Sequence, residues 1–235
     1  MLFTDSFKDH LKTTEGLAYH LYLDTNGYVT VGHGHMMSHV GLALTLPFQT
    51  PMVRTEAARE LFSQLQMPPV AVGISQYMKM GARRATQDEI KKDWNQVKAQ
   101  PFGIHIKSSR FQEYTACWLT LQDIEDLFDQ DLKEHVSSIK QLVFPDFDTL
   151  PQAAQEAIFD MEFNMGAGTL NTFTNFKKAV NARDWDGAAN SCHRITPNED
   201  RNVWTKNLLL KLAMDTRANE SYLLNRELKE SHREY

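Results

Sequence analysis

The sequence predicts a mainly α-helical protein with a small β-hairpin near its N-terminus, and two observations lead to this fold class. Apolar residues recur at helical spacing through most of the chain after residue 120. Near the start, the turn-forming stretch Asp24-Thr25-Asn26-Gly27 separates two short β-prone segments. With 235 residues, the chain can bury a substantial core without disulfides or a structural metal.

The first elements follow from local patterns. Phe3, Phe7 and Leu11 recur every four residues and predict a short amphipathic helix over residues 3–13, with Gly16 beyond its end. Residues 19–23 and 28–32 are rich in aromatic and β-branched residues on either side of the turn, so they predict the two strands of a hairpin.

The middle of the chain carries weaker signals. Residues 54–65 and 85–99 look helical, and the second segment begins with the capping-box pattern Thr86-Gln87-Asp88-Glu89. Between them, MPPVAVGISQYMKMGARR contains two prolines and two glycines, which favour irregular structure.

The C-terminal half predicts a succession of helices. Thr120 opens a helix of about 22 residues, or about 33 Å, which is long enough to bridge two lobes. Pro145 ends this helix, and Pro151 begins another that Gly166 and Gly168 terminate. The remaining predicted helices cover residues 173–182, 185–192, 197–212 and 221–229.

Composition and charge exclude several classes of protein. Apolar residues make up 42% and charged residues 23%, as in folded globular proteins. The net charge of −5 argues against a nucleic-acid partner. We expect no membrane span, since no apolar run approaches about 20 residues, and the N-terminus lacks the layout of a signal peptide. Cys117 and Cys192 are far apart, which indicates free thiols.

Three residues around the hairpin could carry chemistry. Glu15 follows the first predicted helix, Asp24 lies in the hairpin turn and Thr30 lies on the returning strand. Two carboxylates facing one cleft suit glycoside hydrolysis, with one as general acid and the other acting on water or the sugar. Each residue also has a purely structural explanation, because Asp is favoured in turns and Thr in strands. The spacing alone therefore leaves the function open.

A resemblance to a known family decides between these explanations. Glu15-Gly16-Leu17, followed by Leu23-Asp24-Thr25-Asn26-Gly27-Tyr28-Val29-Thr30-Val31-Gly32-His33-Gly34-His35, resembles the active-site segment of phage-type lysozymes, the two-lobed muramidases of tailed phages. Further segments match the helical C-terminal lobe of that family in the same order: 121–128, 163–166, 173–176, 185–189 and 196–198. The resemblance implies one lysozyme-like domain over residues 1–235. It would comprise an active-site lobe at 1–35, an inserted, mostly helical region at 36–119, and a connecting helix with a helical C-terminal lobe at 120–235.

The resemblance also implies a reaction. The enzyme would hydrolyse the β-1,4 bond between N-acetylmuramic acid and N-acetylglucosamine in peptidoglycan, without a cofactor or metal. Glu15 would be the general acid, Asp24 the base or the group stabilising the cationic transition state, and Thr30 a holder of the attacking water. Inversion at the anomeric carbon is implied as well.

The same resemblance implies the substrate contacts. His35 is expected to form hydrogen bonds beside the hairpin on the substrate side, and Met36 falls at a sugar-contact position. Three further residues are expected to line the cleft from the C-terminal lobe: Phe163, Asn164 and Thr196. His33 and His35 could share a strand face and touch a metal, but no third ligand stands at a recognisable spacing, so we expect no metal site.

The chain departs from the family pattern in three ways. The long segment between His35 and Thr120 has no counterpart in the smallest members. It is either a packed helical elaboration or an added wall of the substrate groove. In the second case, the candidate contacts are Trp94 and the basic pairs Arg83-Arg84 and Lys91-Lys92.

The second departure concerns the partner of the catalytic glutamate. Glu199 stands where close relatives of the family carry an arginine that pairs with this glutamate. Arg194 and Arg201 are alternative partners of Glu15. The segment between residues 189 and 196 is shorter.

Two other functions remain open from the sequence, and so does the biological setting. The chain could be a catalytically silent glycan-binding module of a larger cell-wall-targeting protein, or a helical interaction domain. As an enzyme it would be a bacteriolytic phage endolysin, a tail lysozyme or a domain of a secreted antibacterial effector toxin. The insertion and the acidic balance favour a domain of a larger protein. We expect a monomer that is made in the cytoplasm and acts on glycan strands in the periplasm or cell wall. A delivery domain and an immunity protein are further candidate partners.

Overall fold

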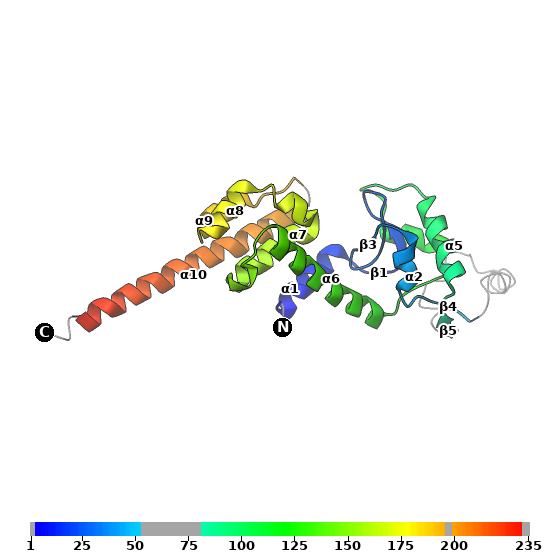
Figure 1. Cartoon of the computed structure of the whole chain (residues 1–235), viewed down its shortest axis with the longest axis horizontal. Coiled ribbons are helices and arrows are strands. Elements are labelled where there is room, and N and C mark those ends of the chain that lie inside the picture. The colour runs from blue at the N-terminus through cyan, green and yellow to red at the C-terminus, as the bar shows by residue number, and fades with distance from the viewer. Residues whose placement is uncertain (1–2, 53–80, 196–198, 232–235) are drawn as a thin grey trace. The chain divides into compact units, whose positions relative to one another are not determined.

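The computed structural model describes residues 3–52, 81–195 and 199–231. It confirms a mainly α fold with small antiparallel sheets (Figure 1). The chain divides into two compact units, one formed by Asp9–Asp131 and the other by Met1–Lys8 with Leu132–Tyr235. The division falls within the helices α1 (Asp5–Glu15) and α6 (Leu121–Leu142). We call the first the hairpin unit and the second the helical unit.

The predicted hairpin is present and gains a third strand. β1 (Ala18–Leu23), β2 (Val29–Gly32) and β3 (His35–Met37) form an antiparallel sheet in that order. The sequence does not reveal β3, because three residues are too few to show a period-2 pattern. Leu23, Val29 and Met37 are aligned across the three strands and are buried, so this face of the sheet packs on the core.

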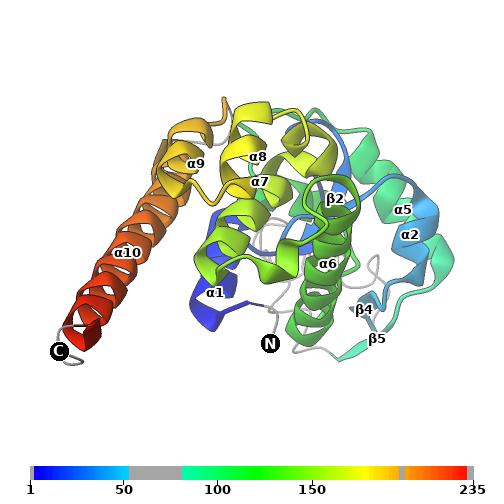
Figure 2. The same ribbon diagram turned by 60° about the vertical axis from the view of Figure 1, so that its left-hand side comes forward.

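The inserted region packs against that apolar face. Its described elements are α2 (Val40–Thr45), β4 (Gln49–Pro51), β5 (Ala82–Arg84), α5 (Gln87–Lys98) and the 3-10 helix η2 (Ser108–Tyr114). Figure 2 shows α2 beside α5, and α5 also contacts β1 and β2. Ile90, Trp94 and Val97 on α5 are buried in the same apolar core as Leu23 and Val29. The insertion is therefore part of the core that supports the hairpin.

Predictions for the inserted region had mixed outcomes. The capping box of Thr86 and Glu89 is confirmed at the start of α5. The predicted helix at 54–65 lies outside the described residues, as does most of the segment predicted to be irregular. The end of that segment, however, forms β5, which pairs with β4. Arg83 binds Glu89 and Lys91 lies 3.8 Å from Asp88, so both cations make local ion pairs.

A buried carboxylate ties α5 to the chain that precedes α6. Asp93 is 3% exposed, and its Oδ2 accepts hydrogen bonds from the backbone N–H groups of Ala116 and Cys117, both at 2.7 Å. Burial raises the pKa of Asp93 to about 6, although these two hydrogen bonds oppose the shift. Asp93 thus satisfies two backbone donors, while burial makes ionisation of its carboxyl less favourable than in water.

The helical unit contains η3 (Phe147–Thr149), α7 (Gln152–Leu170), α8 (Thr174–Asn181), α9 (Trp185–Ser191) and α10 (Glu199–Ser231). α10 packs against α7 and α9, and α8 against α9 (Figure 1). Phe3 and Phe7 from the start of the chain pack on Phe159 of α7, with ring centroids 4.7 and 5.9 Å apart. The sequence predicts that Gly166 and Gly168 end this helix; instead Gly166 interrupts it, with a φ of 78°, and helical structure resumes until Leu170.

Two boundaries in the C-terminal half differ from prediction. Residues 197–212 and 221–229 were predicted as separate helices, but residues 199–231 form the single helix α10. The apolar stripe fades between them, yet the stretch Ala213-Met214-Asp215-Thr216-Arg217-Ala218-Asn219-Glu220 contains neither Gly nor Pro, so nothing ends the helix. By contrast, the predicted helix from Thr120 is confirmed, since Thr120 and Asp123 cap α6 through mutual hydrogen bonds.

Both cysteines are free and buried, as predicted. Among the described helices, none combines the length and apolar character that crossing a membrane requires.

Replacing Asp93 by Ala should destabilise the fold markedly. The variant leaves two backbone N–H groups without their acceptor, at about 1–3 kcal/mol for each buried group. Urea unfolding of the purified protein measures this loss. Asn95→Ala, at an exposed position on the same helix, is the control and should change stability by less than about 0.5 kcal/mol. Equal stabilities of the two variants would contradict the role of Asp93.

The stability advantage of the wild type over Asp93→Asn should grow as the pH falls from 7 to 5. The pKa of Asp93 is about 6 in the fold against 3.8 as its model value. Its stabilising protonation is therefore complete below pH 3.8 and is lost as the pH rises through 6. The difference should change by on the order of 1 kcal/mol. Thermal melting of both proteins across this pH range measures it, and a pH-independent difference would refute the assignment.

Candidate active site

Glu15 is the last residue of α1, rather than lying just beyond the helix as the sequence suggested. Gly16 ends the helix with a φ of 77°, a conformation that a residue with a Cβ rarely adopts. The half-buried Glu15 side chain lies against Gly34, in the turn between β2 and β3. A Cβ at Gly34 would stand 3.5 Å from Glu15 Oε2, so this turn brings backbone close to the carboxylate.

Asp24 is fixed by the hairpin turn that it initiates. Its Oδ1 accepts hydrogen bonds from the backbone N–H groups of Asn26 and Tyr28, at 2.9 and 2.8 Å. Its own N–H donates to the Tyr28 carbonyl at 2.9 Å. This is the Asx-turn behaviour expected of Asp at that position. Both side-chain bonds end on Oδ1, so the turn holds the carboxylate in one orientation without occupying Oδ2.

Thr30 lies on the sheet face opposite the apolar one. Tyr22, Thr30 and Met36 are aligned across β1, β2 and β3 and share this face. Thr30 is 2% exposed, and its hydroxyl donates to the Tyr28 carbonyl at 3.2 Å. Met36 is 49% exposed. The sheet face opposite the apolar one therefore carries a buried hydroxyl and an exposed thioether.

Tyr22, aligned with Thr30 across the sheet, is a further residue of this region that the sequence does not single out. Burial raises the pKa of the Tyr22 hydroxyl, and the negative charges of Glu15 and Asp24 raise it further. Both carboxylates thus lie close enough to this hydroxyl for their charges to act on it. The signal available in the sequence was the alternation along residues 18–23, which places Tyr22 opposite Thr30 once the register is known.

The two histidines hold the hairpin to its neighbours. His35 Nδ1 lies 2.9 Å from Oδ1 of the buried Asp131 on α6. His33 is buried, with Nδ1 at 2.5 Å from the Gly16 carbonyl and its ring 5.4 Å from that of Phe128. Each ring thus has a protein partner, and the described residues include no group of three side chains suited to a metal ion.

The comparison with known families now identifies the chain. A family model described as phage lysozyme matches residues 88–207, slightly more than half of the sequence. The chain belongs to the phage lysozyme family. Membership implies a glycoside hydrolase that acts on peptidoglycan. No curated protein matches the sequence. The matched range begins after the hairpin, so the roles of Glu15, Asp24 and Thr30 are proposals that draw on the motif resemblance and on the geometry above.

The lysozyme residues predicted from the C-terminal lobe lie in the helical unit. Phe163 is half-buried on α7, with its ring 4.8 Å from His135 and 5.6 Å from Phe159. The neighbouring Asn164 is also half-buried, and its Oδ1 is buried without a hydrogen-bond partner among the residues that the structure describes. An unsatisfied buried amide oxygen is costly, which is consistent with a site for an external donor. Thr196 lies outside the described residues.

Arg194 and Arg201, the two arginines that the sequence offers as partners of Glu15, both bind Asp160 within the helical unit. Arg194 Nη2 lies 2.9 Å from Asp160 Oδ2, and Arg201 Nε lies 2.8 Å from Asp160 Oδ1. All three residues are at most 5% exposed. Glu199, at the position of the family arginine, is exposed and lies 3.2 Å from His193. The buried Asp160 carboxylate is therefore paired with two arginines of the helical unit.

Removing the partner of His35 should weaken the hairpin unit of this lysozyme. Asp131→Ala deletes a buried hydrogen-bonded carboxylate, and the expected loss of stability is about 1–3 kcal/mol. Denaturant unfolding measures it. Asp126→Ala, at an exposed position on the same helix, is the matched control. If both variants unfold at the same denaturant concentration as the wild type, the His35–Asp131 pair does not hold the sheet.

Proposed function

We propose that this lysozyme is a muramidase that cleaves the β-1,4 bond between N-acetylmuramic acid and N-acetylglucosamine. The observation that carries the proposal is the placement of two carboxylates at the two turns that flank β2: Asp24 begins the turn before this strand, and Glu15 lies against Gly34 in the turn after it. Two carboxylates with separate roles are the usual requirement for glycoside hydrolysis.

Glu15 is the proposed general acid. Protonated, it donates its proton to the glycosidic oxygen as the bond from that oxygen to the anomeric carbon breaks. Gly34 supports this role because its missing side chain leaves space beside Oε2.

Asp24 and Thr30 are the proposed holders of the attacking water. Asp24 uses only Oδ1 for its turn, which leaves Oδ2 to accept a proton from water or to stabilise the oxocarbenium-like transition state. The Thr30 hydroxyl hydrogen points to the Tyr28 carbonyl, so its lone pairs accept a hydrogen bond from the water. Because Thr30 is buried, this water would be an ordered one.

His35, Met36, Phe163, Asn164 and Thr196 are the proposed substrate contacts. Met36 is exposed on the same sheet face as Thr30, which supports contact with a sugar ring. The buried Asn164 Oδ1 supports acceptance of a hydrogen bond from a substrate N–H or O–H group. A monomeric state, delivery to the cell wall, an antibacterial role, and an immunity protein or delivery domain as partner stay predictions of the sequence.

Glu15→Gln should abolish nearly all lysis with the fold intact. The amide keeps the shape of the side chain but cannot donate the proton, and general acid catalysis contributes about 100- to 10,000-fold. Mass analysis of products from purified peptidoglycan gives both the rate and the bond cleaved. Glu113→Gln, at an exposed glutamate of the same unit, should behave as the wild type. Clearing by Glu15→Gln at the wild-type rate would remove Glu15 from the mechanism.

Asp24→Asn should be nearly as inactive as Glu15→Gln, because an amide neither accepts the proton nor stabilises positive charge. Its Oδ1 can still accept the two backbone bonds of the turn, so the melting temperature should stay near that of the wild type. Asp24→Ala removes the turn bonds as well and separates the structural effect from the chemical one. Activity of Asp24→Asn within a few-fold of wild type would leave Asp24 a turn residue only.

A further inference from the structure

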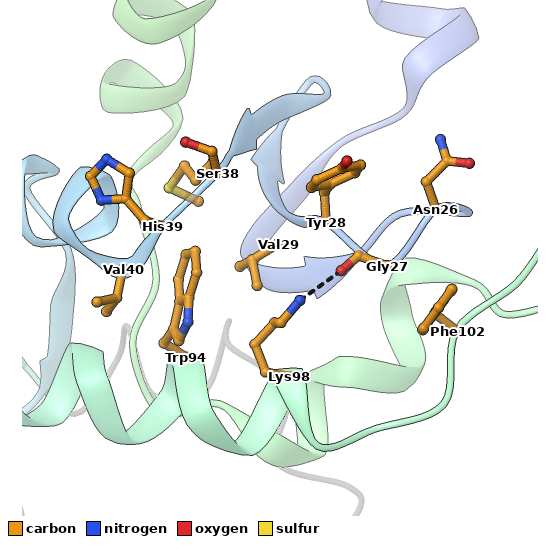
Figure 3. A pocket seen from close by; sticks show the side chains of 11 residues that line it. Asn26, Gly27, Tyr28, Val29, Ser38, His39, Val40, Trp94, Lys98 and Phe102 are labelled. Carbon is orange, nitrogen blue, oxygen red and sulfur yellow. Dashed lines mark hydrogen bonds between the residues drawn. The ribbon is translucent and has the colours of Figure 1, made fainter.

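The hairpin unit contains a pocket that the proposed mechanism does not use. Its volume is about 570 Å³, within the range of about 300–1,000 Å³ that is typical of small-molecule sites. Three segments line it: the hairpin turn at 26–29, the connection from β3 to α2 at 37–40, and Trp94, Lys98 and Phe102 from the end of α5 and the chain beyond it (Figure 3).

The pocket lies on the apolar side of the sheet, away from the proposed catalytic face. Its lining residues Val29 and Met37 are aligned across β2 and β3. Thr30 and Met36, which are also aligned, occupy the opposite face because side chains alternate along a strand. A molecule in the pocket would therefore contact different side chains from those of the cleavage site.

The walls combine aromatic and aliphatic groups. Val29 and Met37 are almost fully buried, and Trp94 rises from α5 beside Lys98 (Figure 3). Tyr28 and Phe102 remain 48% and 54% exposed at the rim. The Phe102 ring packs against Gly27, where an added Cβ would stand only 2.8 Å from it. The pocket thus offers two accessible aromatic rings above an apolar floor.

The polar groups are few and close together. Lys98 Nζ donates to the Gly27 carbonyl at 2.9 Å (Figure 3). An ammonium group has three donors, so two are left for a ligand. The side chains of Asn26, Ser38 and His39 are exposed around the opening. A lysine that already binds a peptide carbonyl is well suited to bind another neutral carbonyl oxygen beside it.

We propose that this pocket binds an N-acetylated sugar of the glycan strand as a second site. The pyranose C–H groups would lie against the Tyr28 and Phe102 rings, the acetamido methyl would contact Val29 and Met37, and the acetamido carbonyl would accept from Lys98. This inference rests on the proposed function for the source of the sugar. Two contacts with one strand would strengthen binding of long glycans more than of short ones.

Titration of the full chain with N,N′-diacetylchitobiose tests the site directly. The readout is the indole N–H signal of Trp94 in the NMR spectrum, assigned by its loss in Trp94→Phe. We expect a saturable shift of this signal. Phe102→Ala should weaken the affinity by about 2- to 10-fold, the equivalent of one aromatic contact. Ile104→Ala, a 79% exposed apolar residue in the same segment, is the matched control.

A second variant and two further ligands make the result decisive. Lys98→Met keeps the aliphatic stem and should lose the preference for acetamido sugars. Cellobiose, which lacks the acetamido group, should bind more weakly than N,N′-diacetylchitobiose. An equal response to cellobiose, or a stronger response to the dipeptide L-Ala-D-Glu, would overturn the proposal, the latter by assigning the pocket to the stem peptide.

Hydrolysis of peptidoglycan, measured on the same samples, separates the two proposals. An unchanged Trp94 signal in a protein that still cleaves glycan refutes the pocket and leaves the muramidase intact. A saturable Trp94 shift in a protein that cleaves nothing supports the pocket and refutes the muramidase.

Discussion

The apolar face of the three-stranded sheet must be covered, and the candidate site depends on that contact. β1, β2 and β3 contain six, four and three residues, and so small a sheet is not stable alone in water. Helix α5 covers it with Ile90, Trp94 and Val97. The turn that orients Asp24 and the turn that brings Gly34 to Glu15 are both parts of this sheet. The inserted region is therefore required for the structure of the site.

The hairpin turn is held from two directions by different kinds of bond. From within, Asp24 accepts two backbone hydrogen bonds, which any Asp at this position of such a turn can do. From outside, Lys98 binds the Gly27 carbonyl and the Phe102 ring covers the Gly27 Cα. Glycine is suited to position 27 for two reasons. It tolerates the left-handed conformation of the turn, with a φ of 81°, and it leaves space for the Phe102 ring. The end of α5 is thus placed to influence the orientation of Asp24.

The helical unit is organised around a buried charge cluster. Asp160, fully buried on α7, accepts from Arg194, Arg201 and the Thr205 hydroxyl, and Asn202 binds Arg194 in turn. Buried charges of this kind require several partners because each loses its hydration. The family match covers all of these residues.

The features that depend on local chemistry can be read from short stretches of the sequence. The Asp24 turn, the capping boxes of α5 and α6, and the break at Gly166 each follow from a few adjacent residues whose side chains satisfy their own backbone. The resemblance of the motif around Glu15, Asp24 and Thr30 pointed to the same family that the match over residues 88–207 shows.

Which distant residues meet depends on tertiary structure. No local pattern could align Tyr22 with Thr30 across the sheet or assign Arg194 and Arg201 to Asp160. The same holds for Trp94, whose burial under the hairpin depends on long-range packing rather than on neighbouring sequence.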